Sequence, residues 1–193
     1  MQPPESVPCP MKYKTVVIDF PWPVAEISAS AAKKMNYGRR MNMPYKTMDL
    51  EAIAAFPIND FADEQCALFM WTTQGFVKAA LDIVDQWGFK FSKLITWDKV
   101  DGINWLGFKT NSEFVIFAYR GRYPLAVDAH CSIRTVFRSM QGRHSEKPDK
   151  FYQIILPFPE PRIDIFARKR HYGYDAWGDG VLPAPTTIES YSL

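Results

Sequence analysis

The residues best suited to chemistry stand near the start of the chain, in the sequence Asp19-Phe20-Pro21-Trp22. They directly follow an apolar run, 15–18, which is typical of a buried strand. A carboxylate, a proline and a large aromatic ring at the mouth of a strand predict a compact pocket for a planar substrate that carries an amine. The alternative is a strand that ends in an ordinary turn, with Asp19 accepting backbone N–H bonds. These four residues leave both interpretations open.

A second group of candidate contacts is basic. Residues 23–46 form a long irregular stretch that contains Lys33, Lys34, Arg39 and Arg40, and loops of this length inside one domain tend to be functional. Between positions 134 and 171, nine basic residues stand against four acidic ones (Arg134, Arg138, Arg143, Lys147, Lys150, Arg162, Arg168, Lys169 and Arg170 against Glu146, Asp149, Glu160 and Asp164). Contact with nucleic-acid phosphates and a solvated charged surface both remain open.

Composition restricts the class of protein. The 193 residues are 47% hydrophobic and 23% charged, the ordinary proportions of a soluble globular protein of about one domain. No apolar run reaches the roughly 18 residues of a membrane helix, and the start lacks a signal-peptide pattern. Cys9, Cys66 and Cys131 are widely spaced, so we expect a cytoplasmic protein without disulfides. The segment 128–131 (Asp-Ala-His-Cys) is a weak metal or nucleophile candidate, and we expect no metal.

The elements that must position these residues follow from hydrophobic periodicity. We expect strands over 14–19, 66–71, 89–97, 113–119 and 162–167, and helices from Thr47 to about 55, from Thr72 or Thr73 to Trp87, and from Pro148 onward. Residues 100–111 and 120–147 are expected to be irregular. Residues 1–13 are predicted to be a flexible arm, 14–180 a single domain and 181–193 a loose tail.

Strands and helices that alternate along the chain predict an α/β fold with a mainly parallel sheet. Ligands of such sheets bind beyond the carboxyl ends of the strands. Asp19, the pair Asp98-Lys99 and the segment 168–180 each follow an expected strand. We therefore expect them to converge on one edge of the sheet.

With these residues in place, the chain resembles the DPPW-type N6-adenine methyltransferases, the family named after the MT-A subunit of the eukaryotic messenger-RNA adenosine methyltransferase. The resemblance runs in order from about 14 to 180. It is carried by Asp-x-Pro-Trp at 19–22, Pro-Tyr-x-Thr-Met at 44–48, Leu-Phe-x-Trp at 68–71, Trp-Gly-Phe-Lys at 87–90, Trp-x-Lys at 97–99, Asn-Ser-Glu at 111–113, His-Ser-x-Lys-Pro-Asp at 144–149, Asp-Ile-Phe-Ala-Arg at 164–168 and Trp-Gly at 177–178. Each match is weak alone, and the ordered set is specific.

The resemblance implies a Rossmann-like methyltransferase fold that uses S-adenosylmethionine (SAM), with helices on both faces of the sheet and the catalytic motif ahead of the cofactor loop. Asp19 would accept a hydrogen bond from the adenine N6 amine, and the carbonyl of Phe20 would accept the other. Trp22 and Tyr45 would flank the base. Trp97, Lys99, Arg39 and Arg40 are the further substrate candidates. The cofactor candidates are Asp19, Lys147, Asp164, Arg168, His171, Trp177 and Asp179.

One departure from the family pattern concerns Phe20, which stands where the family has proline. The acceptor at this position is a main-chain carbonyl, which any residue supplies, but the ring of Phe20 could narrow or reshape the base pocket. Phe69, Trp71, Trp87 and Trp97 are expected to be core and pocket wall rather than stacking platforms for nucleic acid.

The function that the resemblance implies is methyl transfer from SAM to the N6 amine of adenine in nucleic acid, and we favour DNA over RNA. The alternative is a catalytically silent nucleic-acid-binding subunit of the same fold that needs a partner. A weaker third option is methyl transfer to a small-molecule or protein amine. A prokaryotic or phage-like source is expected, and a homodimer that grips the substrate stays open.

Overall fold

The apolar run at the start of the chain forms β1 (Tyr13–Ile18), a strand inside a seven-stranded sheet. The computed structural model describes residues 11–24, 47–105, 108–124, 132–142, 146–178 and 181, with the backbone alone for 103–105. Residues 1–10 of the predicted arm and 182–193 of the predicted tail therefore lie outside the described residues. Within the described residues, no helix is both long and apolar enough to cross a bilayer.

The strand order is β5-β3-β4-β2-β1-β6-β7. The strands are β2 (Ala62–Thr72), β3 (Lys90–Trp105), β4 (Phe108–Arg120), β5 (Val136–Arg138), β6 (Arg162–Ile165) and β7 (Asp175–Trp177). All pairings between neighbours are parallel except the two that β4 makes, with β2 and β3. The prediction of an α/β fold with a mainly parallel sheet is confirmed.

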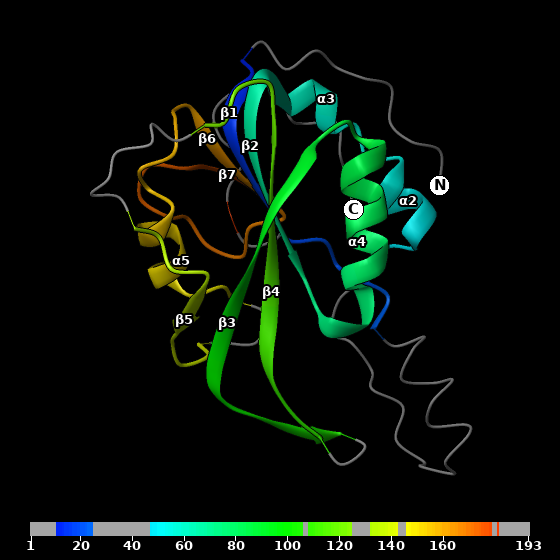
Figure 1. Cartoon of the computed structure of the whole chain (residues 1–193), viewed down its shortest axis with the longest axis vertical. Coiled ribbons are helices and arrows are strands. Elements are labelled where there is room, and N and C mark those ends of the chain that lie inside the picture. The colour runs from blue at the N-terminus through cyan, green and yellow to red at the C-terminus, as the bar shows by residue number, and fades with distance from the viewer. Residues whose placement is uncertain are drawn as a thin grey trace.

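Helices cover both faces of the sheet (Figure 1). On one face lie α2 (Leu50–Ala54), α3 (Ile58–Phe61) and α4 (Val77–Gln86), which follows the 3₁₀ helix η1 (Gln74–Phe76). On the other face lies α5 (Asp149–Ile154). Side chains of β1 alternate between the two layers: Val16 and Ile18 join the core under α2–α4, whereas Val17 joins the core under α5. A strand buried on both faces accounts for the continuous apolar sequence of 15–18.

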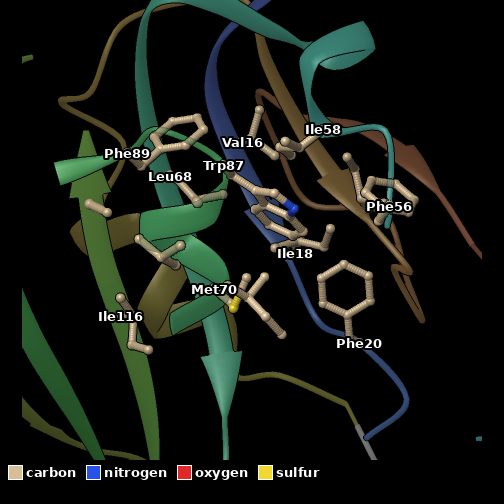
Figure 2. Packing of buried hydrophobic residues seen from close by; sticks show 14 of the residues in the cluster. Val16, Ile18, Phe20, Phe56, Ile58, Leu68, Met70, Trp87, Phe89 and Ile116 are labelled. Carbon is tan, nitrogen blue, oxygen red and sulfur yellow. The ribbon is translucent and has the colours of Figure 1, made fainter. Parts of the chain in front are cut away.

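Phe20 belongs to the core under α2–α4, where its side chain is 3% exposed (Figure 2). Its ring centroid lies 5.4 Å from that of Phe56, 5.9 Å from that of Trp87 and 5.2 Å from that of Phe166. The ring therefore anchors the segment after β1 on the helical side. The sequence analysis expects four further aromatic residues in the core, and the structure buries each of them: Phe69, Trp71, Trp87 and Trp97.

Several predicted boundaries are wrong, each for a local physical reason. Residues 100–111 are not an irregular stretch: β3 continues to Trp105 and β4 begins at Phe108, so the two strands form a long hairpin (Figure 1). Antiparallel pairing satisfies the backbone of these strands, although apolar and polar residues do not alternate regularly in the segment. Asp98-Lys99 accordingly lies within β3 rather than after it.

The helix starts also differ from the prediction. The cap of α2 is Asp49 rather than Thr47, and its carboxylate accepts a hydrogen bond from the Ala52 N–H at 2.7 Å. Residues 74–76 form the 3₁₀ turn η1 before α4 begins, and Thr73 makes no side-chain cap bond. Three short elements, α3, β5 and β7, were not predicted, because three or four residues carry too little periodicity to be recognised.

Truncating Phe20 tests its place in the core. We expect Phe20→Ala to lower the free energy of unfolding by about 3–5 kcal/mol, because it opens a cavity among three packed rings. Chemical denaturation measures this change. Phe108→Ala is the control, because that ring is 79% exposed in the same sheet. Equal effects of the two substitutions would contradict the placement of Phe20.

Candidate active site

The sheet topology gathers charged residues where β1, β2 and β6 end, beside the middle of β4. Asp19 follows β1, and its backbone N–H donates to the carbonyl of Ile165, the last residue of β6, at 3.2 Å. Glu113 lies in the middle of the antiparallel β4, opposite Trp97 of β3, and its neighbour Phe114 pairs with Thr72 at the end of β2. Both carboxylates therefore lie at the carboxyl edge of the parallel strands, as the sequence predicts for Asp19.

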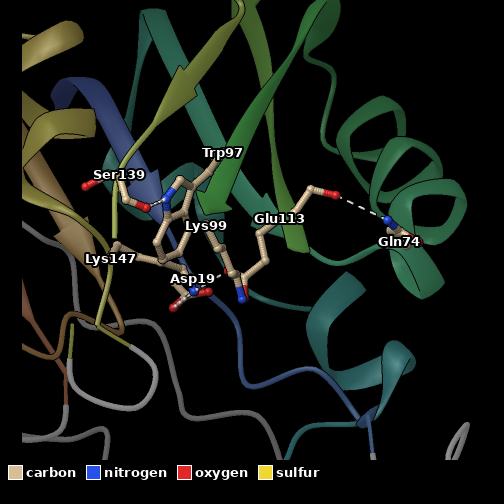
Figure 3. Close-up of polar contacts among 8 residues, drawn as sticks. Asp19, Gln74, Trp97, Lys99, Glu113, Ser139 and Lys147 are labelled. Atoms are coloured by element: carbon tan, nitrogen blue, oxygen red, sulfur yellow. Dashed lines mark hydrogen bonds and ion pairs between the residues drawn. The ribbon is translucent and has the colours of Figure 1, made fainter. Parts of the chain in front are cut away.

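Lys147, which precedes α5, bridges the two carboxylates (Figure 3). Its Nζ lies 2.9 Å from Asp19 Oδ2 and 3.2 Å from Glu113 Oε2. Lys99 of β3 pairs with the other oxygen of Glu113. The result is a chain of alternating charges, Asp19–Lys147–Glu113–Lys99, whose side chains are each less than a fifth exposed.

Aromatic rings form the floor beneath both lysines. The Nζ of Lys147 lies 5.0 Å from the ring centroid of Trp71, and that of Lys99 lies 5.1 Å from the centroid of Trp97. Both rings are fully buried. The ammonium groups thus combine ion pairing with cation–π contact, which is stronger where water is excluded.

Burial and pairing shift the pKa values of these groups in different directions. Burial raises the pKa of the Asp19 carboxyl above its usual value, and the opposing effect of Lys147 is smaller. For Glu113, burial is outweighed by Lys147 and Lys99, which hold its pKa below the usual value. For Lys147, burial is outweighed by Asp19 and Glu113, so its pKa is raised. Lys147 is therefore a permanent cation at physiological pH.

A pocket opens beside this charge chain. Its wall consists of Asp19, Lys147, Tyr152, Asp164, the segment 166–169 and His171. Its shape depends on Gly178: a Cβ there would lie 2.5 Å from the backbone nitrogen of Ala167, closer than real contacts allow. The backbone of Ala167 also donates to the carbonyl of Trp177 at 2.9 Å. The pairing of Trp177-Gly178 with this segment thus defines one wall of the pocket.

The structure brings together most of the predicted cofactor residues that it describes. Asp19, Lys147, Asp164, Arg168 and His171 all line the pocket. Trp177 lies behind its wall, with its ring centroid 5.1 Å from that of Phe166. Asp179 lies outside the described residues, as do the predicted substrate residues Tyr45, Arg39 and Arg40.

The structure assigns Trp22 and Trp97 mainly to the core. Trp22 is 4% exposed, stacks on Phe76 with 5.3 Å between ring centroids, and donates its indole N–H to the carbonyl of Trp71 at 2.9 Å. Trp97 donates its indole N–H to the carbonyl of Ser139 at 2.8 Å. A contact of either ring with a substrate base stays a prediction.

The backbone of the Asp19–Trp22 segment forms a tight turn. The carbonyl of Phe20 accepts a hydrogen bond from the N–H of Trp22 at 2.9 Å, and the carbonyl of Pro21 accepts one from the N–H of Met48 at 2.9 Å. The Phe20 ring is not among the side chains that line the pocket. The Phe20 ring thus packs in the core and leaves this pocket unlined by it, and its effect on a pocket for the base stays a prediction.

Sequence reasoning missed the roles of Glu113 and Tyr152. In the sequence Glu113 stands out only as part of the Asn-Ser-Glu motif, yet it is the second carboxylate on Lys147. Tyr152 falls in the helix expected after Pro148, where no pattern indicates that its hydroxyl donates to Asp164 at 2.7 Å. The one sequence feature that could have indicated a role for Tyr152 is a tyrosine on a buried helix face, because a buried phenol usually has a hydrogen-bond partner.

Three other groups singled out in the sequence are the segment 128–131, His144 and Cys66. The segment 128–131 and His144 lie outside the described residues. Elsewhere in the part of the chain that the structure describes, no cluster of three His, Cys, Asp or Glu side chains has the arrangement of a metal site. Cys66 is buried in the core, and burial raises the pKa of its thiol to about 12, so it is not a nucleophile at neutral pH.

Residues 13–180 match the sequence model of the MT-A70 family. The chain belongs to the MT-A70 family of methyltransferases. The resemblance found in the sequence is thereby confirmed. The chain is also 27% identical over 195 residues to the Type II methyltransferase M.MunI of Mycoplasma sp, in an alignment that covers 92% of this chain and 83% of that protein. Both findings identify this MT-A70 protein as a methyltransferase.

Removing the bridging cation tests the charge chain. We expect Lys147→Met to lower the free energy of unfolding at pH 8 by about 3 kcal/mol, because it leaves Asp19 buried without its cation. The loss should shrink at lower pH, where the carboxyl takes up a proton. Chemical denaturation of Lys147→Met and wild type at pH 8 and at a lower pH measures both the loss of stability and its decrease.

Lys109→Met is the matched control for this prediction. Lys109 also forms an ion pair, with Asp101 at 2.7 Å, but both side chains are more than half exposed. We expect this substitution to leave the free energy of unfolding unchanged within error, since exposed pairs contribute little. If Lys147→Met behaved in the same way, the buried chain would not stabilise the fold.

Proposed function

We propose that this protein transfers the methyl group of SAM to the N6 amine of adenine in nucleic acid, with DNA as the favoured substrate. The observation that carries the proposal is Asp19: a carboxylate only 18% exposed, held 2.9 Å from Lys147 at the carboxyl edge of the sheet, beside a pocket. The match to a Type II methyltransferase supports a nucleic-acid substrate.

The residues of the pocket fit SAM. Lys147 supplies a cation for a carboxylate, and Asp164 supplies a buried acceptor for ammonium or hydroxyl donors. When bound, SAM would supply a methyl group on a sulfonium: the amine nitrogen would bond to the methyl carbon while the carbon–sulfur bond breaks, with S-adenosylhomocysteine as the leaving group. Every other contribution comes from the protein's own side chains and backbone.

Asp19 is the residue that acts on the amine. The lone pair of an adenine amine is delocalised into the ring, so the amine is a poor nucleophile and gains positive charge as the new C–N bond forms. A fixed carboxylate that accepts an N–H bond stabilises this charge without reorganisation. Each carboxylate oxygen accepts more than one hydrogen bond, so an incoming amine can share Asp19 with Lys147.

The raised pKa of Asp19 also bears on proton removal. The methylated nitrogen must lose one proton to regenerate a neutral amine. A carboxyl whose pKa is raised by burial is a better base than an exposed one once it is ionised. Asp19 is thus the acceptor for the N–H bond and the first acceptor for its proton.

Substitution of Asp19 tests the proposal. We expect Asp19→Asn to lower tritiated methyl transfer from SAM to DNA by about 100-fold or more, because the amide neither carries charge nor accepts a proton. Asp101→Asn is the matched control, since Asp101 lies on the exposed hairpin with its side chain 87% exposed. This variant should retain wild-type activity.

The same assay separates the alternative function. A catalytically silent nucleic-acid-binding subunit would bind DNA or RNA but incorporate no label, with or without a partner. If the wild-type protein behaves in this way, the enzymatic proposal is wrong. Label in RNA but not in DNA would overturn the substrate preference alone.

A further inference from the structure

The carboxylate of Asp164 has two oxygens in different situations. It lies on β6, is 2% exposed and forms part of the pocket wall. Its Oδ2 accepts a hydrogen bond from the Tyr152 hydroxyl at 2.7 Å. Its Oδ1 is buried and has no hydrogen-bond partner among the described residues. A buried acceptor without a donor is costly to the fold, so this oxygen points to a donor that a ligand brings.

Tyr152 is itself held rigidly. Its ring stacks on the imidazole of His171, with 3.4 Å between ring centroids and 13° between planes. His171 in turn has its Nδ1 3.0 Å from Asp149 Oδ1. The ring of Tyr174 packs edge-on against Tyr152 at 5.3 Å. The direction of the Tyr152 hydroxyl is therefore fixed by rings from the segment between β6 and β7.

We infer that Tyr152 is a positioning residue for SAM binding: its hydroxyl holds Asp164 Oδ2 and so reserves Oδ1 as the acceptor for an ammonium or hydroxyl donor of the cofactor. This inference rests on the proposed function, which supplies the cofactor. Tyr152 acts through Asp164 rather than by a bond that it makes to the ligand.

The role of Tyr152 should also show in the pH dependence of ligand binding, because its hydroxyl affects the pKa of Asp164. Burial raises the pKa of Asp164 to about 8, with Asp19 adding to the increase, whereas the hydrogen bond from Tyr152 and the charge of Lys147 oppose it. Tyr174, in the segment before β7, has its own pKa raised by burial and by the charge of Asp164, so its phenol stays neutral and adds no charge beside this carboxyl. Loss of the Tyr152 hydroxyl should raise the pKa of Asp164 further. A ligand that needs the carboxylate then binds fully only at higher pH.

The test is calorimetric titration of the full chain with S-adenosylhomocysteine, which binds without turnover. We expect Tyr152→Phe to weaken binding about tenfold at pH 7.5, since it removes the hydrogen bond that favours the carboxylate form of Asp164, the form that the ligand needs. We also expect the pH at which affinity rises to move upward. Tyr174→Phe is the matched control: it removes a buried hydroxyl from the same cluster, one without a hydrogen-bond partner among the described residues.

The results of this titration distinguish failure of the inference about Tyr152 from failure of the proposed function. Equal affinity and an equal pH profile for Tyr152→Phe and wild type would overturn the inference while leaving the proposed function intact. A weaker affinity with an unmoved pH profile would also overturn it, because a merely structural role predicts that result. If wild type binds neither S-adenosylhomocysteine nor SAM, the proposed function fails and the inference with it.

A second variant covers the case in which Tyr152→Phe does not fold. Asp164→Asn keeps the size of the side chain but removes its titration. We expect this variant to bind S-adenosylhomocysteine more weakly than wild type and to lose the rise in affinity between pH 7 and pH 9. If the rise persists in Asp164→Asn, Asp164 is not the acceptor and Tyr152 positions nothing for the cofactor.

Discussion

The ion pair between Asp19 and Lys147 is the interaction on which the rest of the site depends. Two buried ions are stable only if each compensates the other, and removal of one leaves an uncompensated charge. Here the compensation extends to Glu113 and Lys99, so two acids and two bases balance. Because these residues come from the segment after β1, from β3, from β4 and from the segment before α5, the charge balance links parts of the chain that are far apart in the sequence.

The hydrophobic residues around Asp19 hold this carboxylate in place. The ring of Phe20 is packed among three other rings under the helices. In the same core, the indole N–H of Trp22 donates to the carbonyl of Trp71 in β2. The backbone between them is fixed by the bond from Met48 to Pro21. The aromatic residues of the Asp-Phe-Pro-Trp sequence thus act chiefly by fixing the acid that they flank. A fixed acceptor stabilises developing charge better than a mobile one.

Much of this arrangement could be predicted from the sequence, because its signals are local. The apolar run before Asp19 predicts a buried strand, and Gly88, at φ +76°, has the left-handed conformation expected of a helix end. The rule for parallel sheets predicts that Asp19 and the segment from Arg168 meet at one edge, and the family motifs add Lys147 and Asp164. The hairpin of β3 and β4 could not be predicted, since its sequence lacks regular alternation and strand pairing orders it. The partners of Glu113 and Tyr152 depend on tertiary contacts across more than ten residues, which no local pattern contains.

We propose that the carboxylate of Asp19 directs a methyl group to an exocyclic adenine amine. The decisive measurement is mass spectrometry of nucleosides, after DNA and RNA have each been incubated with the protein and with SAM whose methyl group carries deuterium. We expect labelled N6-methyldeoxyadenosine from DNA. Label on the N4 amine of cytosine, label on a ring carbon or nitrogen, or no label in either nucleic acid would contradict it.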